Sequence, residues 1–242
     1  MSLYVISDLH LSTNESTNKS MEKFGTKWKD YQKKLEKYFR AIINDDDIVV
    51  IPGDISWAMT LEEAKSDFKF LDSLPGTKII GKGNHDFWWS TATKINSFFE
   101  QNEIKSIKLL HNNAYLLDDC IICGSRGWFY DEKQQKTVGE VDYEKIVARE
   151  AQRLEISLKE AIAYKEAHPE LPILVFLHFP PVYGDFVCDK ILDVLKKYQI
   201  SNCYYGHIHN NYSIPRQFTF DSITFTMVAA DYLNFAPMPI FL

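Results

Sequence analysis

Residues 77–89 read TKIIGKGNHDFWW, in which a short apolar run is followed by a glycine-flanked polar motif and three aromatic residues. An apolar run bounded by glycine predicts a buried strand over 77–81. Asn84, His85 and Asp86 come directly after it, where the chain turns. Polar side chains at the end of a strand are typical of the ligand-binding edge of an α/β sheet.

Four more apolar runs end in the same way. Residues 3–7, 47–52, 172–177 and 201–205 read as buried strands. The polar residues that follow them are Asp8 and His10, Asp54, His178, and His207 and His209. Helical periodicity predicts helices over 28–45, from Thr60 to the break at Pro75–Gly76, over 140–167 and over 189–197.

Strands that alternate with helices predict right-handed crossovers and a mostly parallel sheet, and therefore an α/β fold. Residues 107–123 differ, because short apolar runs are separated by Asn112–Asn113 and by Asp118–Asp119, which predict hairpin turns. The tail from residue 217 is β-rich. No repeat and no low-complexity linker interrupts the chain, so residues 1–242 are expected to form a single domain.

The bulk composition indicates a globular protein without a basic face. Hydrophobic residues make up 45% and charged residues 25%, and the formal net charge is −6. This charge argues against long nucleic acids and anionic membranes as partners. No signal peptide or membrane-spanning run is recognisable. Cys120 and Cys123 lie in an apolar run and read as buried strand residues, so a cytoplasmic location is expected.

The polar residues at the strand ends form a set of potential metal ligands. Asp8 and His10 are two residues apart, as are His207 and His209, so each pair can point in one direction from an extended chain. The set contains nitrogen and oxygen ligands and no thiolate, which suits Mn, Fe, Zn or Co. Seven ligands exceed the needs of one ion and predict two divalent ions sharing a carboxylate. The candidates are Asp8, His10, Asp54, Asn84, His178, His207 and His209.

Each motif alone has a plain structural explanation, since Gly-Asp pairs and single histidines are common in turns. His111 and His168 are interpreted in that way. Five such motifs at five strand ends favour the metal site instead. Asp86 keeps two interpretations, as a residue that orients a neighbour or as a cap for the following helix.

The order of these motifs resembles that of the calcineurin-like metallophosphoesterases, close to the small bacterial phosphohydrolases among them. The matching motifs are Asp8-Leu9-His10, Gly53-Asp54, Gly83 to Asp86, His178, and Gly206 to His209. The resemblance implies a four-layer αββα sandwich, with two central mixed sheets flanked by helices, and a dinuclear metal centre.

The resemblance also implies roles. Asp8, His10 and His209 would hold one metal ion, and Asn84, His178 and His207 the other, with Asp54 bridging them. His85 would be the catalytic histidine that contacts substrate. Trp57 and Ala58 stand where the protein serine/threonine phosphatases of this superfamily have Asp and Arg, which argues against a protein substrate.

The expected function is therefore hydrolysis of a phosphate mono- or diester by attack of a hydroxide that bridges two metal ions. The expected substrate is small and phosphorylated, with a nucleotide among the candidates. A metal-binding scaffold without catalysis is the alternative, and the presence of His85 favours the enzyme. A nuclease is a third possibility, which the missing basic stripe disfavours.

Several further residues keep two interpretations. Arg126, between glycines after a strand, is either a phosphate contact or a structural ion-pair residue. Residues 129–143 form either a lid or a solvated loop, and Tyr183 is a candidate for the pocket wall. Phe87, Trp88 and Trp89 are expected to pack against the sheet and the following helix, the alternative for the two tryptophans being stacking on a nucleobase.

Overall fold

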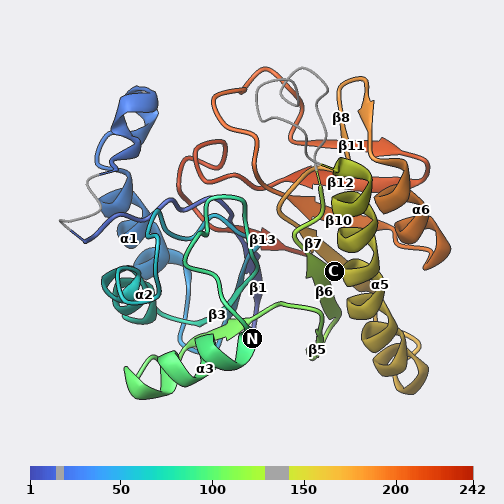
Figure 1. Ribbon diagram of the computed structural model, residues 1–242, viewed down its shortest axis with the longest axis horizontal. Helices are drawn as coiled ribbons and strands as arrows, with labels where there is room; N and C mark the ends of the chain where they lie inside the picture. Colours follow the sequence, from blue (N-terminus) through green and yellow to red (C-terminus); the bar gives the residue numbers. More distant parts are fainter. Residues whose placement is uncertain (15–18, 129–141, 242) are drawn as a thin grey trace.

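Two large sheets form the centre of the computed structural model, which describes residues 1–14, 19–128 and 142–241 (Figure 1). The first sheet has the strand order β13-β1-β2-β3-β4 and the second the order β11-β12-β10-β7-β6-β5. The first contains β1 (Leu3–Val5), β2 (Ile48–Ile51), β3 (Thr77–Ile80), β4 (Ile107–Leu109) and β13 (Met238–Ile240). The second contains β5 (Ala114–Leu116), β6 (Ile121–Ser125), β7 (Ile173–Leu177), β10 (Asn202–Tyr205), β11 (Gln217–Phe220) and β12 (Ile223–Met227).

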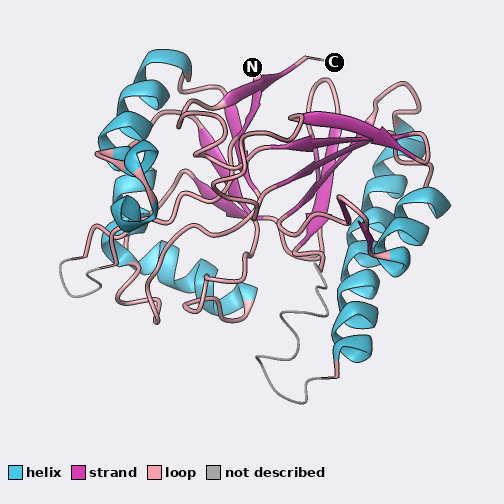
Figure 2. Cartoon of the chain, turned by 90° about the horizontal axis from the view of Figure 1, so that it is seen from above, coloured by secondary structure: helices cyan, strands magenta, loops and turns pink. Residues whose placement is uncertain are grey.

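Helices cover the outer faces of both sheets, so the molecule has four layers (Figure 2). The helices are α1 (Tyr31–Ile42), α2 (Lys65–Asp72), α3 (Ala92–Gln101), α5 (Tyr143–Ala167) and α6 (Asp189–Lys197). The shorter elements are the 3-10 helices η1 (Met21–Phe24) and η2 (Thr26–Trp28). A two-stranded sheet is formed by β8 (Val182–Tyr183) and β9 (Phe186–Val187). The predicted αββα sandwich is confirmed.

The central strands are apolar throughout because both of their faces are covered. In β2, Val49 and Ile51 pack with the helices of the first sheet, while Ile48 and Val50 pack between the sheets. In β7, Leu174 and Phe176 face that same middle layer. Because successive side chains of a strand point to opposite faces of the sheet, each strand contributes side chains to two cores.

Both sheets are mixed. In the first, β1 to β4 run parallel and only β13 is antiparallel. In the second, β6, β7, β10 and β12 run parallel, with the antiparallel strands β5 and β11 at the two edges. The carboxyl ends of the parallel strands therefore lie at one edge of each sheet, which is where the candidate ligands follow.

Two local predictions are wrong. Asn112–Asn113 is not a hairpin turn, because β4 pairs with β3 and β5 pairs with β6, so the chain crosses between the sheets there. The second helix begins at Lys65 and not at Thr60. The Thr60 hydroxyl does accept from the Glu63 backbone N–H, but Lys65 N bonds to Glu62 O, a turn that interrupts the helical ladder.

Cys120 and Cys123 are buried free cysteines on opposite faces of the second sheet. Cys120 packs between the sheets and Cys123 packs against the helices. The two sulfurs therefore cannot bind one metal ion, and the structural interpretation is confirmed. None of the described helices is both long and apolar enough to cross a membrane.

Candidate metal centre

The strand ends of the two sheets are joined by backbone hydrogen bonds at the edge that carries the polar residues. Asp8 N donates to Gly53 O at 3.0 Å, and His10 N donates to Asp54 O at 2.9 Å, within the first sheet. Gly206 N donates to His178 O at 3.1 Å within the second. Between the sheets, Ser7 and Ala229 form a parallel bridge. These bonds hold the ligand-bearing turns in a fixed arrangement.

Asp8, His10 and His209 form one group of potential ligands, although His209 lies 199 residues from His10 in the chain. The His10 and His209 Nε2 atoms are 3.0 Å apart, and His209 Nε2 is 3.3 Å from Asp8 Oδ1. Asp8 and His10 are buried. Three buried or partly buried donor atoms thus meet at one point.

Asn84, His178 and His207 form the second group. Asn84 Oδ1 is 2.7 Å from His178 Nε2 and 3.0 Å from His207 Nδ1. Asn84 comes from the first sheet, while the two histidines come from the second. This group therefore exists only because the two sheets pack together.

Asp54 lies between the two groups. Its Oδ2 atom is 3.6 Å from His10 Nε2 and 3.5 Å from His178 Nε2. Asp54 is 1% exposed, so water does not solvate its carboxylate. A carboxylate that reaches an imidazole of each group has the place required of a bridging ligand.

The backbone is strained at the ligands. Asp8, His10, Asp54 and His207 have φ values of 63°, 46°, 53° and 70°. Residues other than glycine rarely adopt this left-handed region, and strain of this kind gathers at functional sites. The turns aim each side chain back toward the edge of the sheets.

Glycine is required where turns approach the carboxylates. A Cβ atom on Gly83 would lie 2.0 Å from Asp54 Oδ1, and one on Gly206 would lie 2.2 Å from Asp8 Oδ2. Both contacts are impossible for a larger residue. The glycines beside the ligands in the sequence therefore mark the closest approaches in the site.

Burial and charge shift the protonation of the site. Burial lowers the pKa of His209, but Asp8 and Asp231 outweigh it and raise the pKa to about 10. Burial opposes ionisation of Asp8, yet the His209, His178 and His10 rings bring its pKa below the usual value. Burial, with Asp86 and Asp8 nearby, raises the pKa of Asp54. Burial lowers the pKa of His207 to about 4.

The donor set fits divalent metal ions. It offers two carboxylates, one carboxamide and four imidazoles, and the Nδ1 atoms of His10 and His178 are buried without a hydrogen-bond partner among the described residues. Two imidazole nitrogens 3.0 Å apart need a shared proton or a cation between them. Nitrogen and oxygen ligands without thiolate suit Mn, Fe, Zn or Co.

His85 lies beside the ligand candidates, and its ring contacts the rings of His10 and Trp57. Its backbone N–H donates to Asp54 Oδ1 at 2.8 Å, and its ring packs on Trp57 with centroids 4.4 Å apart. Trp57 also stacks on His10 at 4.8 Å. Within the described residues, no group forms a hydrogen bond with the His85 ring. Burial lowers the pKa of this ring, so it is neutral at neutral pH and able to donate one hydrogen bond.

Asp86 joins two of the turns. Its carboxylate accepts from the backbone N–H groups of residues 54–56 and of Gly83, and from the Trp88 indole N–H at 3.0 Å. Burial raises the pKa of Asp86 to about 6, while the backbone N–H groups oppose this shift. Thr91 caps α3, so the helix-capping interpretation of Asp86 is wrong. The carboxylate instead positions the turns that carry Asp54 and Asn84.

Arg126 lies close to the metal centre, and its guanidinium forms an ion pair. Its carbonyl accepts from His178 N at 3.2 Å, and its NH2 atom is 3.0 Å from Glu150 Oε1. Glu150 is buried. The structure thus shows the ion-pair interpretation of Arg126, and its contact with phosphate stays a prediction.

Asp231 belongs to the site and was not predicted. Its Oδ1 atom is 3.0 Å from His209 Nδ1, and its Oδ2 atom accepts from Asn210 N and from the Tyr212 hydroxyl, both at 2.9 Å. A carboxylate on the far nitrogen of a metal-binding imidazole fixes the orientation of the ring. The sequence signal was a buried acidic residue in the apolar run Val228–Asp231.

The remaining candidates lie around this centre. Trp88 is buried and packs edge-on against Phe68 with centroids 4.8 Å apart, as expected for a core residue. Trp89 packs against His111 with ring centroids 5.6 Å apart. Phe87 is 54% exposed, so its expected packing against the sheet is wrong. The Tyr183 hydroxyl accepts from Asn211 Nδ2 at 2.6 Å. Residues 129–141 of the predicted lid lie outside the described residues.

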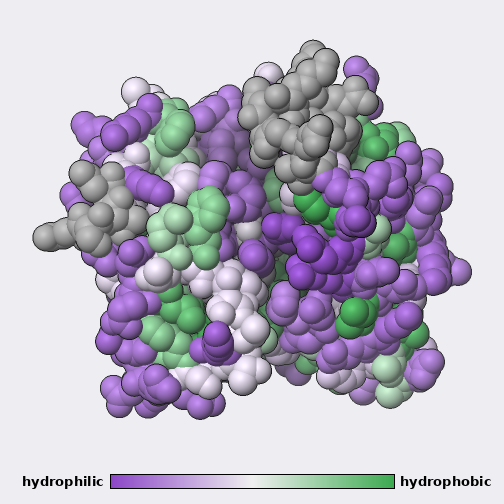
Figure 3. Space-filling model, viewed as in Figure 1, coloured by the Kyte–Doolittle hydropathy of each residue, from purple (hydrophilic) through white to green (hydrophobic). Residues whose placement is uncertain are grey.

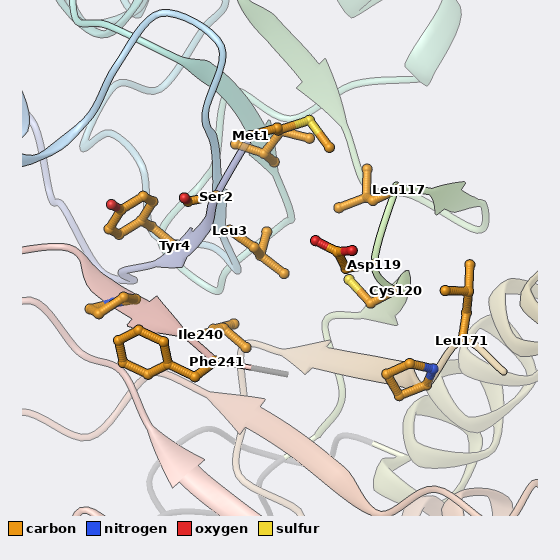
Figure 4. Close-up of a pocket in the computed structure, with 13 residues that line it drawn as sticks. Met1, Ser2, Leu3, Tyr4, Leu117, Asp119, Cys120, Leu171, Ile240 and Phe241 are labelled. Carbon is orange, nitrogen blue, oxygen red and sulfur yellow. The ribbon is translucent and has the colours of Figure 1, made fainter.

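The opposite edge of the sheets carries a cavity of ≈ 590 Å³ with a different character (Figure 4). It is lined mainly by apolar side chains, such as Leu3 and Ile48 at the amino ends of β1 and β2 and Ile240 at the carboxyl end of the antiparallel β13. Asp119 is the acidic residue among its lining residues, and no histidine lines it. The groups of potential metal ligands found among the described residues lie at the carboxyl edge and not in this cavity.

Comparison with known proteins agrees with this geometry. The sequence model of a family described as calcineurin-like phosphoesterase matches residues 1–211, a range that contains all seven ligand candidates. No curated protein matches the sequence.

Solved structures share the fold at low sequence identity. A protein of unknown function from Aquifex aeolicus superposes with a TM-score of 0.52 and 14% identity, covering 98% of this chain and 95% of the other. A phosphopantetheinyl hydrolase from Mycobacterium tuberculosis gives a TM-score of 0.51 and 15% identity, covering 99% of this chain and 95% of the other.

Proposed function

This chain belongs to the calcineurin-like phosphoesterase family, and on that basis we propose that it hydrolyses a phosphate ester with two divalent metal ions. The position of Asp54 carries the proposal, because its Oδ2 atom is 3.6 Å from His10 and 3.5 Å from His178. Each imidazole belongs to a different ligand group. One carboxylate that serves both groups is the arrangement expected for a dinuclear centre.

The ligand groups divide between the ions as their contacts suggest. Asp8, His10 and His209 would hold one ion, and Asn84, His178 and His207 would hold the other, with Asp54 shared. Once bound, the ions would supply Lewis-acid activation of water and of the phosphate group. The charge of two divalent ions exceeds that of the two carboxylates, so an acidic chain can still attract a phosphate at this point.

His85 is the proposed catalytic residue of the chain itself. Its ring is partly exposed beside the ligand candidates and packs against Trp57 at an interplanar angle of 51°. A neutral imidazole N–H in this place donates a hydrogen bond to a phosphate oxygen or to the leaving oxygen. That bond strengthens as negative charge builds up on the oxygen, and so it stabilises the transition state.

The proposed substrate is a small phosphorylated compound. Trp57 and Ala58 stand where the family resemblance places the Asp and Arg of the protein serine/threonine phosphatases, so the second motif lacks a guanidinium. The net charge of −6 disfavours long nucleic acids. With proteins and long nucleic acids disfavoured, the proposed substrate is a compound small enough to bind at the metal centre between the two sheets.

Hydrolysis of p-nitrophenyl phosphate and bis(p-nitrophenyl) phosphate tests the proposal. Protein loaded with Mn²⁺ is expected to release nitrophenol from at least one ester, and chelation or Asp54→Asn is expected to abolish release. Turnover that survives both treatments would contradict the metal-dependent reaction. Metal binding without turnover of any ester would favour a scaffold protein.

A further inference from the structure

Positively charged side chains gather beside the proposed metal centre, around one buried carboxylate. Glu150 Oε1 is 3.0 Å from Arg126 NH2, 3.1 Å from Arg153 NH1 and 4.0 Å from Arg149 Nε. Lys82 lies close enough for the charges of Arg126 and Arg153 to act on it. We call Lys82, Arg126, Arg149 and Arg153 the cationic cluster.

The cluster carries more positive charge than its carboxylate neutralises. One guanidinium would balance Glu150, and three approach the same oxygen. Lys82 forms no ion pair or hydrogen bond with any described residue, although its side chain is partly buried. Holding like charges together without a counter-ion is unfavourable. An excess of this kind favours the binding of an anion.

Unused hydrogen-bond donors accompany this charge. The Nε atom of Arg126 and the indole nitrogen of Trp128 are buried without a partner among the described residues. The Arg126 guanidinium lies 4.9 Å from the centre of the Trp128 ring. Buried donors that lack a partner are costly, and an anion that accepts from them would remove that cost.

The cluster adjoins the metal centre through both sheets. From the first sheet, Lys82 precedes Asn84 by two residues, which span at most about 7 Å of extended chain. From the second, the Arg126 carbonyl accepts from His178 N. Aromatic rings also connect the two sites. The ring centroids of Trp128 and Phe179 are 5.3 Å apart, and those of Phe179 and His207 are 4.5 Å apart.

The cluster is also open to solvent on its outer side. The Arg149 and Arg153 side chains are 57% and 33% exposed. Figure 3 shows strongly hydrophilic surface over the upper part of α5 and the strand ends next to it. A small anion can therefore reach the guanidinium groups without any movement of the core.

We propose that the cationic cluster binds a second anionic group of the substrate, while the metal centre binds the phosphate that is hydrolysed. The substrate class is then a small ester with two phosphate groups a few bonds apart, such as a nucleoside bisphosphate. This inference rests on the proposed phosphoesterase function, which supplies the first phosphate site. Arginine forks suit the second phosphate because they donate two parallel hydrogen bonds.

Lys82 is the member of the cluster whose removal leaves the Glu150 ion pairs in place, because those pairs are made by the three arginines.

Binding affinity separates this inference from catalysis. The probes are adenosine 5′-phosphate and adenosine 3′,5′-bisphosphate, which share the nucleoside and differ by one phosphate. Calorimetric titration uses the Mn²⁺-loaded His85→Ala protein, in which slow turnover keeps both probes intact. We expect the bisphosphate to bind at least tenfold more tightly, and Lys82→Gln in the same background to reduce that preference to threefold or less.

Lys159→Gln is the matched control, because Lys159 lies on α5, is 66% exposed and loses the same charge. It is expected to keep the tenfold preference. Equal affinity for the two probes, or a preference that Lys82→Gln leaves intact, would overturn the inference. Hydrolysis of either probe by the unmodified protein is scored separately. A binding preference without hydrolysis would refute the proposed function alone, and hydrolysis without preference would refute the inference alone.

Discussion

At the scale of single residues, His85 is the proposed catalytic residue that is not itself a metal ligand. It packs on Trp57 at 4.4 Å and lies outside both ligand groups. Removing it should therefore leave the metal ions in place while taking away a hydrogen-bond donor to the reacting phosphate.

His85→Ala is expected to lower kcat by about 10²–10⁴-fold, the usual effect of losing a general acid or base. Metal content should stay equal to that of the unmodified protein, because no ligand is lost. Steady-state hydrolysis at saturating Mn²⁺, together with elemental analysis, measures both quantities. Full activity in the variant would show that His85 has no part in the chemistry.

The contact of Asp231 with His209 predicts that it supports metal binding by orienting that ring. Asp231→Asn should weaken metal affinity by about 10–100-fold, the range found when the carboxylate behind a ligating histidine is lost. Competition with a fluorescent chelator gives the affinity. Asp221→Asn, an exposed acidic residue that pairs with Lys196, is the control and should leave the affinity unchanged. Equal affinities in the two variants would contradict the role of Asp231.

At the scale of elements, Asp86 joins the turn after β2 to the turn after β3. Its carboxylate accepts four backbone N–H groups and one indole N–H. The two turns carry Asp54 and Asn84, one ligand shared by both groups and one that belongs to the second group only. Their relative position therefore depends on a single buried anion.

Asp86→Asn places an amide N–H₂ group among these N–H donors. We expect the free energy of unfolding to fall by about 3 kcal/mol, since each hydrogen bond to a charged group contributes about 1.5–3 kcal/mol. Urea denaturation measures the loss, with exposed Asp46→Asn as the control. If both variants unfold at the same urea concentration, the carboxylate does not hold the turns together.

At the scale of the whole molecule, metal binding is coupled to protons because the site assembles buried groups from both sheets. Asp8 and Asp231 raise the pKa of His209 to about 10, so the metal-free protein holds a proton on this ring at pH 7. A metal ion must displace that proton to bind the ring. Affinity should therefore rise with pH.

We expect Mn²⁺ affinity to increase about tenfold for each pH unit between pH 6 and 8, as one proton is released for each His209 bound. Calorimetry in two buffers with different enthalpies of ionisation counts the protons. Affinity that does not change over this range would show that His209 is not a ligand or is already neutral.

The strands were predictable because each carries its own local signals, whereas the four layers were implied by the resemblance to the calcineurin-like metallophosphoesterases. Apolar runs covered on both faces and polar residues at their ends identified β1, β2, β3, β7 and β10 before any contact was known. The crossing at Asn112–Asn113 was not predictable, since two asparagines after a strand look the same in a hairpin turn and in a passage between sheets. The choice depends on which strands pair, and that is a property of the whole fold.

The same reasoning explains which parts of the site were missed. The ligands stand in motifs of fixed spacing, so their chemistry was visible in the sequence. Asp231 and the cationic cluster come from separate segments without a shared pattern, and only the packing of the sheets and α5 brings them to the centre. A single acidic residue at the end of an apolar run, as at Asp231, is too common a pattern to identify a site on its own.

Metal stoichiometry tests the central claim most directly, namely that two ligand groups from two sheets share Asp54. Protein equilibrated with excess Mn²⁺ and then freed of unbound metal should contain two ions per chain, and Asp54→Asn should lower this number without unfolding the chain. A content near zero in the unmodified protein, or an unchanged content of two in Asp54→Asn, would contradict the account.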